Sequence, residues 1–105
     1  MPILKENPTL NDIQSYVIEL ENERGFAHQN AVEKCLLLGE EIGELFKAVR
    51  KKQQIKIDNN SKVTTVGEEL ADILIYLCAI ANRFDISLEE AFRSKEEINK
   101  KRKWE

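Results

Sequence analysis

Four acidic side chains occur as two pairs with the same spacing. Glu41 and Glu44 are three residues apart, and so are Glu69 and Asp72. In a helix, two residues with this spacing lie about 60° apart around the axis and about 4.5 Å apart along it, so their side chains project from one face. Two carboxylates on one face suit the binding of a divalent cation, and oxygen ligands of this kind favour Mg²⁺ or Mn²⁺.

The surroundings of Asp72 favour the metal interpretation. Between Leu70 and Ala81, Asp72 is the one residue outside the apolar set, and no Lys or Arg lies within one helical turn of it on its own segment. An ionised carboxylate in a buried helix is costly unless it is paired or bound to a metal. If the two helices pack antiparallel, all four carboxylates can meet, and four negative charges in one pocket require cations. The alternative is an exposed acidic face, because Glu pairs with this spacing are common in helices.

The elements that must position these acids are predicted to be helices. Both prolines lie in the first eight residues, and only four glycines occur, so few residues interrupt a helix after Thr9. Apolar residues also recur at helical spacing. We predict helices over residues 10–23, 30–54, 65–84 and 88–101.

The first and the fourth of these helices carry sequence signals at their ends. Thr9 and Asp12 form a start like a capping box, and Gly25 is suited to end the first helix. Ser87 and Glu90 form a second capping box before the fourth helix.

The segment between the second and third helices, residues 55–62, is predicted to be a polar loop. Short strands over 55–57 and 63–66 are a weaker alternative. A loop at this position would lie near the mouth of the acidic site, where a lid would be useful. Trp104, near the end of the sequence, is expected to dock back onto the body.

Two features predict close packing of the helices. Gly39 and Gly43 lie one turn apart, and each costs roughly 1 kcal/mol of helix propensity against Ala, so we expect a neighbouring helix to approach closely there. The third helix is apolar nearly all round, which a chain of 105 residues cannot bury alone. We therefore expect a single all-α domain over residues 1–105, a four-helix bundle completed by oligomerisation.

Composition excludes several classes of protein. Lys and Arg number 16 and Asp and Glu number 19, which gives a net charge of −3 and argues against binding of a nucleic-acid polymer. Charged residues make up 33% and no segment is long and apolar enough for a membrane span, so we expect no membrane partner. Cys35 and Cys78 match no metal-ligand spacing and fit a reduced, cytoplasmic protein.

Basic and amide side chains could complete a phosphate site. Lys51 lies two to three turns beyond the acidic pair of the second helix, on roughly the same face. Lys95, Asn99 and Arg102 form one stripe of donors on the fourth helix. Such donors near a bound metal could hold the oxygens of a polyphosphate, although each stripe alone is more typical of a solvated helix surface.

Aromatic residues offer candidate contacts for a nucleotide base. Tyr76 lies one turn after Asp72 and could stack on a base or sugar, or could serve as a core tyrosine. His28 is the single histidine and lies beside Phe26. No second histidine exists to share a zinc ion with it, so a surface position is the ordinary expectation for His28.

Three segments, in this order, carry a resemblance to a known family. They are Gly39-Glu-Glu-Ile-Gly-Glu-Leu45, Glu68-Glu-Leu-Ala-Asp-Ile-Leu-Ile-Tyr-Leu77 and the pattern Lys95-x-x-x-Asn99-x-x-Arg102. In an all-helical context they resemble the MazG-like nucleoside triphosphate pyrophosphohydrolases, and the similarity extends over nearly the whole sequence. Some members of that family carry an aromatic residue near the position of Lys51, which this sequence lacks.

The resemblance implies a fold, an assembly and a set of functional residues. It implies an all-α homodimer or homotetramer that depends on Mg²⁺. It implies metal ligation by Glu41, Glu44, Glu69 and Asp72, nucleotide contact at Tyr76, phosphate contact at Lys95, Asn99 and Arg102, and a base site at Phe26 with His28 close by.

We therefore predict a Mg²⁺-dependent enzyme that cleaves nucleoside triphosphates to monophosphates and pyrophosphate, with deoxynucleotides as the expected substrates. Mg²⁺ would neutralise charge while a water attacks phosphorus, and the cellular role would be removal of unwanted nucleotides. One alternative is a phosphoribosyl-ATP pyrophosphatase. Another is a helical dimerisation module without catalysis.

Overall fold

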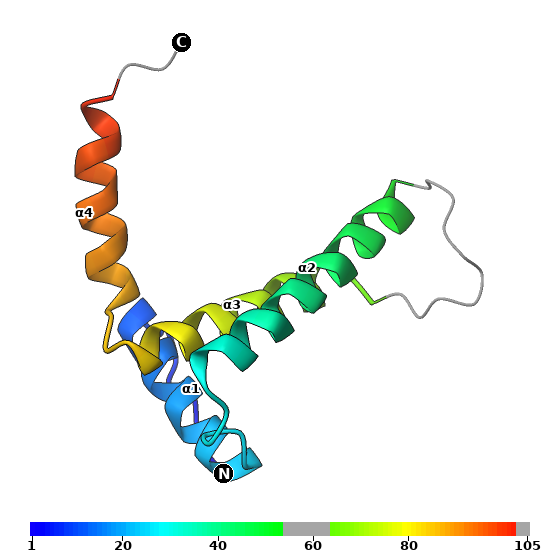
Figure 1. The fold of residues 1–105 in the computed structure, drawn as a ribbon, viewed down its shortest axis with the longest axis horizontal. Helices are drawn as coiled ribbons and strands as arrows, with labels where there is room; N and C mark the ends of the chain where they lie inside the picture. The colour runs from blue at the N-terminus through cyan, green and yellow to red at the C-terminus, as the bar shows by residue number, and fades with distance from the viewer. Residues whose placement is uncertain (54–63, 103–105) are drawn as a thin grey trace.

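The computed structural model describes residues 1–53 and 64–102. Four helices account for most of this part of the chain, and it contains no strand (Figure 1). They are α1 (Leu10–Arg24), α2 (Ala31–Lys52), α3 (Val66–Arg83) and α4 (Leu88–Lys100). The all-α prediction and the four predicted helices are confirmed. The predicted loop over 55–62, its role as a lid, most of the alternative strands and the docking of Trp104 lie outside the described residues.

Helices α2 and α3 lie side by side and run antiparallel, as the acidic site requires (Figure 1). Helix α1 crosses the end of this pair where α3 finishes, and α4 packs on α1 and projects away from α2 and α3. The antiparallel arrangement brings the middle of α2 next to the beginning of α3. None of the described helices is both long enough and apolar enough to cross a membrane.

The predicted helix ends are confirmed by local hydrogen bonds. The Thr9 hydroxyl accepts from the backbone N–H of Asp12, and the Asp12 carboxylate accepts from the N–H of Thr9 at 2.8 Å. Gly25 ends α1 with a φ of 79°, a left-handed conformation that favours glycine. The Ser87 hydroxyl accepts from the N–H of Glu90 at 3.2 Å and caps α4. These caps satisfy backbone donors that no helix can satisfy internally.

The apolar core lies between α1 and α3. Its fully buried members are small or medium-sized, and partly buried side chains from α1, α3 and α4 pack around them. The buried residues are Val17, Leu20, Cys78 and Ala79. The core therefore fixes α3 against α1, and Cys78 lies within it as a free thiol.

A buried amide joins α1, α3 and the start of α4. The Gln14 side chain donates to Asn82 Oδ1 at 3.1 Å and to the Ile86 carbonyl at 2.9 Å. Its oxygen accepts from the N–H of Leu88 at 2.7 Å. Because one side chain satisfies groups on three segments, it fixes the direction in which α4 leaves the body.

A single chain leaves much apolar surface open. The radius of gyration is 16.3 Å, against about 13 Å for a compact domain of this size. A Cβ atom added at Gly39 or Gly43 would meet no described atom within 4 Å, so the expected close approach of a neighbouring helix is not made by the described helices of one chain. Leu70 on α3 and Phe46 on α2 are more than half exposed. The described part of one chain does not cover the faces that were expected to be buried.

Candidate metal centre

Three of the four predicted carboxylates meet between α2 and α3. Glu41 comes from the middle of α2, and Glu69 and Asp72 come from the first two turns of α3. One oxygen from each side chain lies within 4.8 Å of the others. Such a cluster of oxygen atoms can coordinate one divalent cation, or two that lie close together.

The carboxylates of the cluster repel one another, and their mutual repulsion changes their pKa values. Glu41 shares a hydrogen bond with Glu69, and this bond, loss of solvent and the neighbouring negative charges raise the pKa of Glu41 to about 7. The hydroxyl of Thr64 donates to Glu69 Oε1 and, with the bond to Glu41, holds the pKa of Glu69 below its usual value. Burial and the charges of Glu69 and Glu68 raise the pKa of Asp72. The cluster therefore retains a proton that a cation would displace.

One oxygen atom of the cluster has no partner. Glu69 is only 3% exposed, and its Oε2 atom is buried without a hydrogen bond to any described group. A buried, unsatisfied carboxylate oxygen costs free energy, and a cation would satisfy it. The donor set consists of hard oxygen atoms, so these residues fit Mg²⁺ or Mn²⁺.

The fourth predicted ligand, Glu44, lies beside this group but outside it. Its Oε1 atom is 3.5 Å from Nζ of Lys47, one turn further along α2. The negative charge of Glu44 nevertheless contributes to the raised pKa of Glu41. Glu44 is thus close enough to act on the cluster, while its carboxylate is paired with a lysine.

A small cavity adjoins the acids. Its volume is about 120 Å³, and Asp72 lines it together with Phe26 and Tyr76, two of the predicted nucleotide contacts. Loss of solvent and nearby carboxylates, with Glu41 first among them, raise the pKa of Tyr76. The cavity joins the predicted metal ligands to the predicted aromatic contacts.

Sequence reasoning missed three charged residues beside this cavity. Lys34 and Glu21 are almost fully buried, with Lys34 Nζ 3.0 Å from Glu21 Oε2. Arg83 binds both oxygens of the same carboxylate, at 2.8 and 2.9 Å. Their positions in the sequence could have shown that these side chains are buried. Glu21 lies one turn after the core residue Val17, and Lys34 lies one turn before Leu38, an apolar residue of α2.

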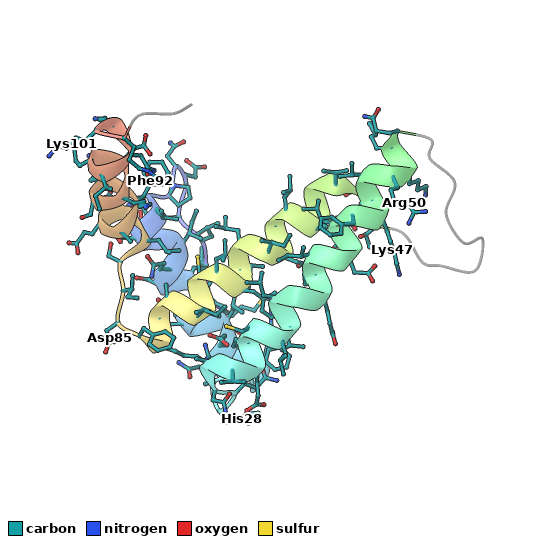
Figure 2. All side chains as sticks on the ribbon, turned by 45° about the horizontal axis from the view of Figure 1, so that its top comes forward. His28, Lys47, Arg50, Asp85, Phe92 and Lys101 are labelled. Atoms are coloured by element: carbon teal, nitrogen blue, oxygen red, sulfur yellow. The ribbon has the colours of Figure 1, made fainter. Side chains whose placement is uncertain are left out.

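Other predicted contacts are not brought to the acids within one chain. Lys51 lines a separate, wider cavity of about 610 Å³ near the end of α2. His28 is exposed before the start of α2, far from Lys47 and Arg50 near the other end of that helix (Figure 2). The donor stripe of Lys95, Asn99 and Arg102 belongs to the α4 segment, which projects away from α2 and α3 (Figure 1).

Comparison with known proteins identifies related sequences and a related structure. The family model for the MazG nucleotide pyrophosphohydrolase domain matches residues 26–104. The chain is 33% identical over 100 residues to dCTP pyrophosphatase 1 from Mus musculus, and 36% identical over 107 residues to dCTP pyrophosphatase 1 from Homo sapiens. Each match covers 90% of this chain but 59% of the relative, so the chain spans about three fifths of the length of these proteins.

A solved structure shares the arrangement of the helices. The crystal structure of iMazG from Vibrio DAT 722 superposes with a TM-score of 0.63 at 29% sequence identity. The match covers 89% of this chain and 95% of that chain.

Proposed function

The chain belongs to the MazG nucleotide pyrophosphohydrolase domain family, and we propose that it hydrolyses deoxynucleoside triphosphates to monophosphates and pyrophosphate with the help of Mg²⁺. The observation that carries this proposal is the cluster of Glu41, Glu69 and Asp72, with one buried oxygen atom left without a partner. Because two relatives are named dCTP pyrophosphatases, dCTP is the first substrate to test. We place the activity in the cytoplasm, where it would remove unwanted nucleotides.

The same three carboxylates are the proposed ligands of the cation. Glu44 joins them when its carboxylate turns from Lys47 towards the cluster. When bound, Mg²⁺ neutralises the charge of the triphosphate and the charge that develops as the linkage between its α and β phosphorus atoms breaks.

The chain's own residues prepare the site in two ways. Glu41 and Glu69 share a proton that they would release on holding a cation, so both carboxylates would be fully ionised only beside positive charge. Phe26 and Tyr76 hold the base in the cavity that Asp72 also lines. This contact positions the triphosphate over the acids.

Phosphate contacts require a second copy of the chain. We propose a homodimer or homotetramer in which a neighbouring chain covers the open face at Gly39 and Gly43 and supplies Lys95, Asn99 and Arg102 from its α4 segment. The exposed apolar side chains of α2 and α3 and the projection of α4 away from its own acids support this arrangement (Figure 1). Contacts to substrate by Lys51 and His28 stay predictions.

The proposal is tested with the purified chain and a panel of nucleotides, with and without Mg²⁺. The panel contains the four deoxynucleoside triphosphates, dUTP and phosphoribosyl-ATP. We expect dCMP and pyrophosphate from dCTP, loss of the reaction on chelation of the metal, and loss in Asp72→Asn with unchanged helical circular dichroism. Cleavage of phosphoribosyl-ATP alone, or of no nucleotide with either Mg²⁺ or Mn²⁺, would contradict it.

A further inference from the structure

The cavity beside Asp72 has the size of a single ring. Its volume is about 120 Å³, and a protein cavity of about 150 Å³ holds one benzene molecule. Phe26 and Tyr76 contribute aromatic faces to its lining. A six-membered ring is therefore the natural occupant, while a purine, with two fused rings, would need the cavity to widen.

A buried ion pair lies in the wall of the same cavity. Lys34 is 4% exposed and Glu21 is 5% exposed, and both line the cavity. The Lys34 ammonium lies 5.2 Å from the ring centre of Phe26 and 5.6 Å from that of Tyr76. The positive charge is thus held among the two aromatic side chains proposed to contact the base.

The third member of the cluster, Arg83, donates all of its side-chain N–H groups to protein oxygen atoms. Its five N–H groups bond to the two oxygens of Glu21 and to the backbone carbonyls of Ala79, Phe26 and Gln29. Arg83 therefore has no hydrogen-bond donor left for a ligand. It fixes the Glu21 carboxylate and the chain around Phe26 in place.

Lys34 and Glu21, in contrast, have unused hydrogen-bonding capacity. Among the described residues, the Lys34 ammonium has a single oxygen partner, Glu21 at 3.0 Å, although it carries three N–H groups. Glu21 receives three charged donors, whereas a carboxylate has about four acceptor positions. One donor group and one acceptor group thus remain side by side at the cavity.

We propose that Lys34 and Glu21 read the polar edge of a pyrimidine base, with the ammonium donating to a ring acceptor and the carboxylate receiving the adjacent N–H. This inference rests on the proposed function and adds a specificity site to it. Cytosine presents its N3 acceptor beside an amino group, and uracil and thymine present a carbonyl oxygen beside N3–H. Each therefore matches a donor next to an acceptor.

The hydrogen bonding of Lys34 supports this assignment. Lys34 and Arg83 share one carboxylate, that of Glu21, and a buried ammonium is costly unless acceptors satisfy its remaining N–H groups. A base carbonyl or ring nitrogen would be such an acceptor, and it could reach the ammonium from the cavity that Lys34 lines. Substrate binding would then complete the hydrogen bonding of Lys34.

The test compares a natural substrate with two analogues that lack the polar edge. They are the triphosphate of difluorotoluene deoxyriboside, a nonpolar ring of pyrimidine shape, and deoxyribose 5′-triphosphate without a base. The variant is Lys34→Met, which keeps an unbranched apolar chain between the rings. Lys5→Met removes an exposed lysine that pairs with Asp12 and is the matched control.

We expect wild-type kcat/KM to be about 10- to 100-fold higher for dCTP than for the nonpolar analogue, the usual effect of a hydrogen bond to a charged group. In Lys34→Met this ratio falls close to one, because kcat/KM falls much more for dCTP than for the triphosphate without a base. Lys5→Met keeps the wild-type ratio. Because both kcat/KM values in a ratio are measured on the same protein preparation, a smaller fraction of folded protein lowers both equally and does not change the ratio.

Three results would overturn the inference. They are an unchanged ratio in Lys34→Met, an equal loss on the triphosphate without a base, or a wild-type enzyme that does not distinguish dCTP from the nonpolar analogue. The last result needs no variant, so it decides the question even if Lys34→Met does not fold. Failure of the proposed function is different, because the wild-type protein would then cleave none of these triphosphates.

Discussion

Two clusters of charged side chains lie along α2 and α3, the first of them around a carboxylate from α1, and their charges are paired to different degrees. Near the end of α3, the Glu21 carboxylate binds Arg83 and Lys34 at 2.8–3.0 Å. Near its start, Glu41, Glu69 and Asp72 face one another. Burial of charge is tolerated where it is paired and costly where it is not. We interpret the Glu21–Arg83 pair as a structural clamp and the second cluster as a site that binds a ligand.

The two clusters depend on each other through the cavity between them. Arg83 holds the backbone carbonyls of Phe26 and Gln29, so the satisfied cluster positions an aromatic residue of the proposed substrate site. The unsatisfied cluster contributes Asp72 to the same cavity. Loss of the Glu21–Arg83 contact should change mainly stability, whereas substitutions in the second cluster should change mainly activity.

The largest effect is expected on activity from Glu69→Gln. Loss of one negatively charged ligand should lower kcat/KM on the order of 1,000-fold, since a bound metal contributes several kcal/mol to transition-state stabilisation. The unfolding temperature of the metal-free variant should not fall, because Gln still accepts from Thr64 and one repelling charge is gone. Steady-state kinetics and calorimetric unfolding measure the two quantities. A large drop in stability would assign a structural role to Glu69.

A large loss of stability is expected for Glu21→Ala, in contrast to Glu69→Gln. This change leaves the buried Lys34 and the partly buried Arg83 without their carboxylate and should lower the free energy of unfolding by about 3–5 kcal/mol. The matched control is Glu23→Ala on the same helix, whose exposed carboxylate lies 3.9 Å from the N-terminal amine and should matter by about 0.5 kcal/mol or less. Urea unfolding followed by circular dichroism separates the two. Equal stabilities would contradict the assignment of a clamp.

A smaller effect concerns pH. The pKa of Glu41 is raised from 4.5 to about 7, so its protonation stabilises the metal-free fold below pH 4.5, and this contribution is lost as pH rises through about 7. The cation must displace that proton, so Mg²⁺ affinity should rise by up to about tenfold per pH unit below 7 and level off above it. Calorimetric titration in buffers of different ionisation enthalpy detects the released proton. An affinity that is constant between pH 5.5 and 8 would contradict the shared proton.

The smallest effect is expected from Glu40→Gln. Glu40 neighbours the cluster in sequence but is exposed, and an exposed charge contributes less than about 1 kcal/mol. Its kcat/KM should therefore change by less than about fivefold. The measurement is the same steady-state assay used for Glu69→Gln. A loss as large as that of Glu69→Gln would show that charge near the site matters more than ligation.

Local signals made the helices and the acids predictable. Caps such as Thr9 with Asp12 act within one turn, so the chain around them determines where a helix begins. A further capping box, formed by Asn30 and Glu33 before α2, has the same local sequence signature. The positions of Glu41 and Glu69 along their helices bring the two carboxylates together when α2 and α3 pack antiparallel.

Long-range pairing and helix direction were not predictable in this way. Glu21 meets Arg83 across 62 positions of the sequence, and no local pattern encodes that distance. The direction of α4 depends on Gln14, whose side chain bonds to groups 68 to 74 positions away. Lys34 looks like an ordinary charged helix residue until α1 packs beside it. These features arise from tertiary packing.

Titration of the metal-free protein with Mn²⁺, followed by electron paramagnetic resonance of the unbound ion, tests most directly whether acids from α2 and α3 hold one metal site together. The account predicts saturable binding by the wild-type protein. It also predicts strong loss of binding in both Glu41→Gln on α2 and Asp72→Asn on α3, with helical circular dichroism unchanged. Absence of binding in the wild-type protein, or wild-type binding in both variants, would contradict it.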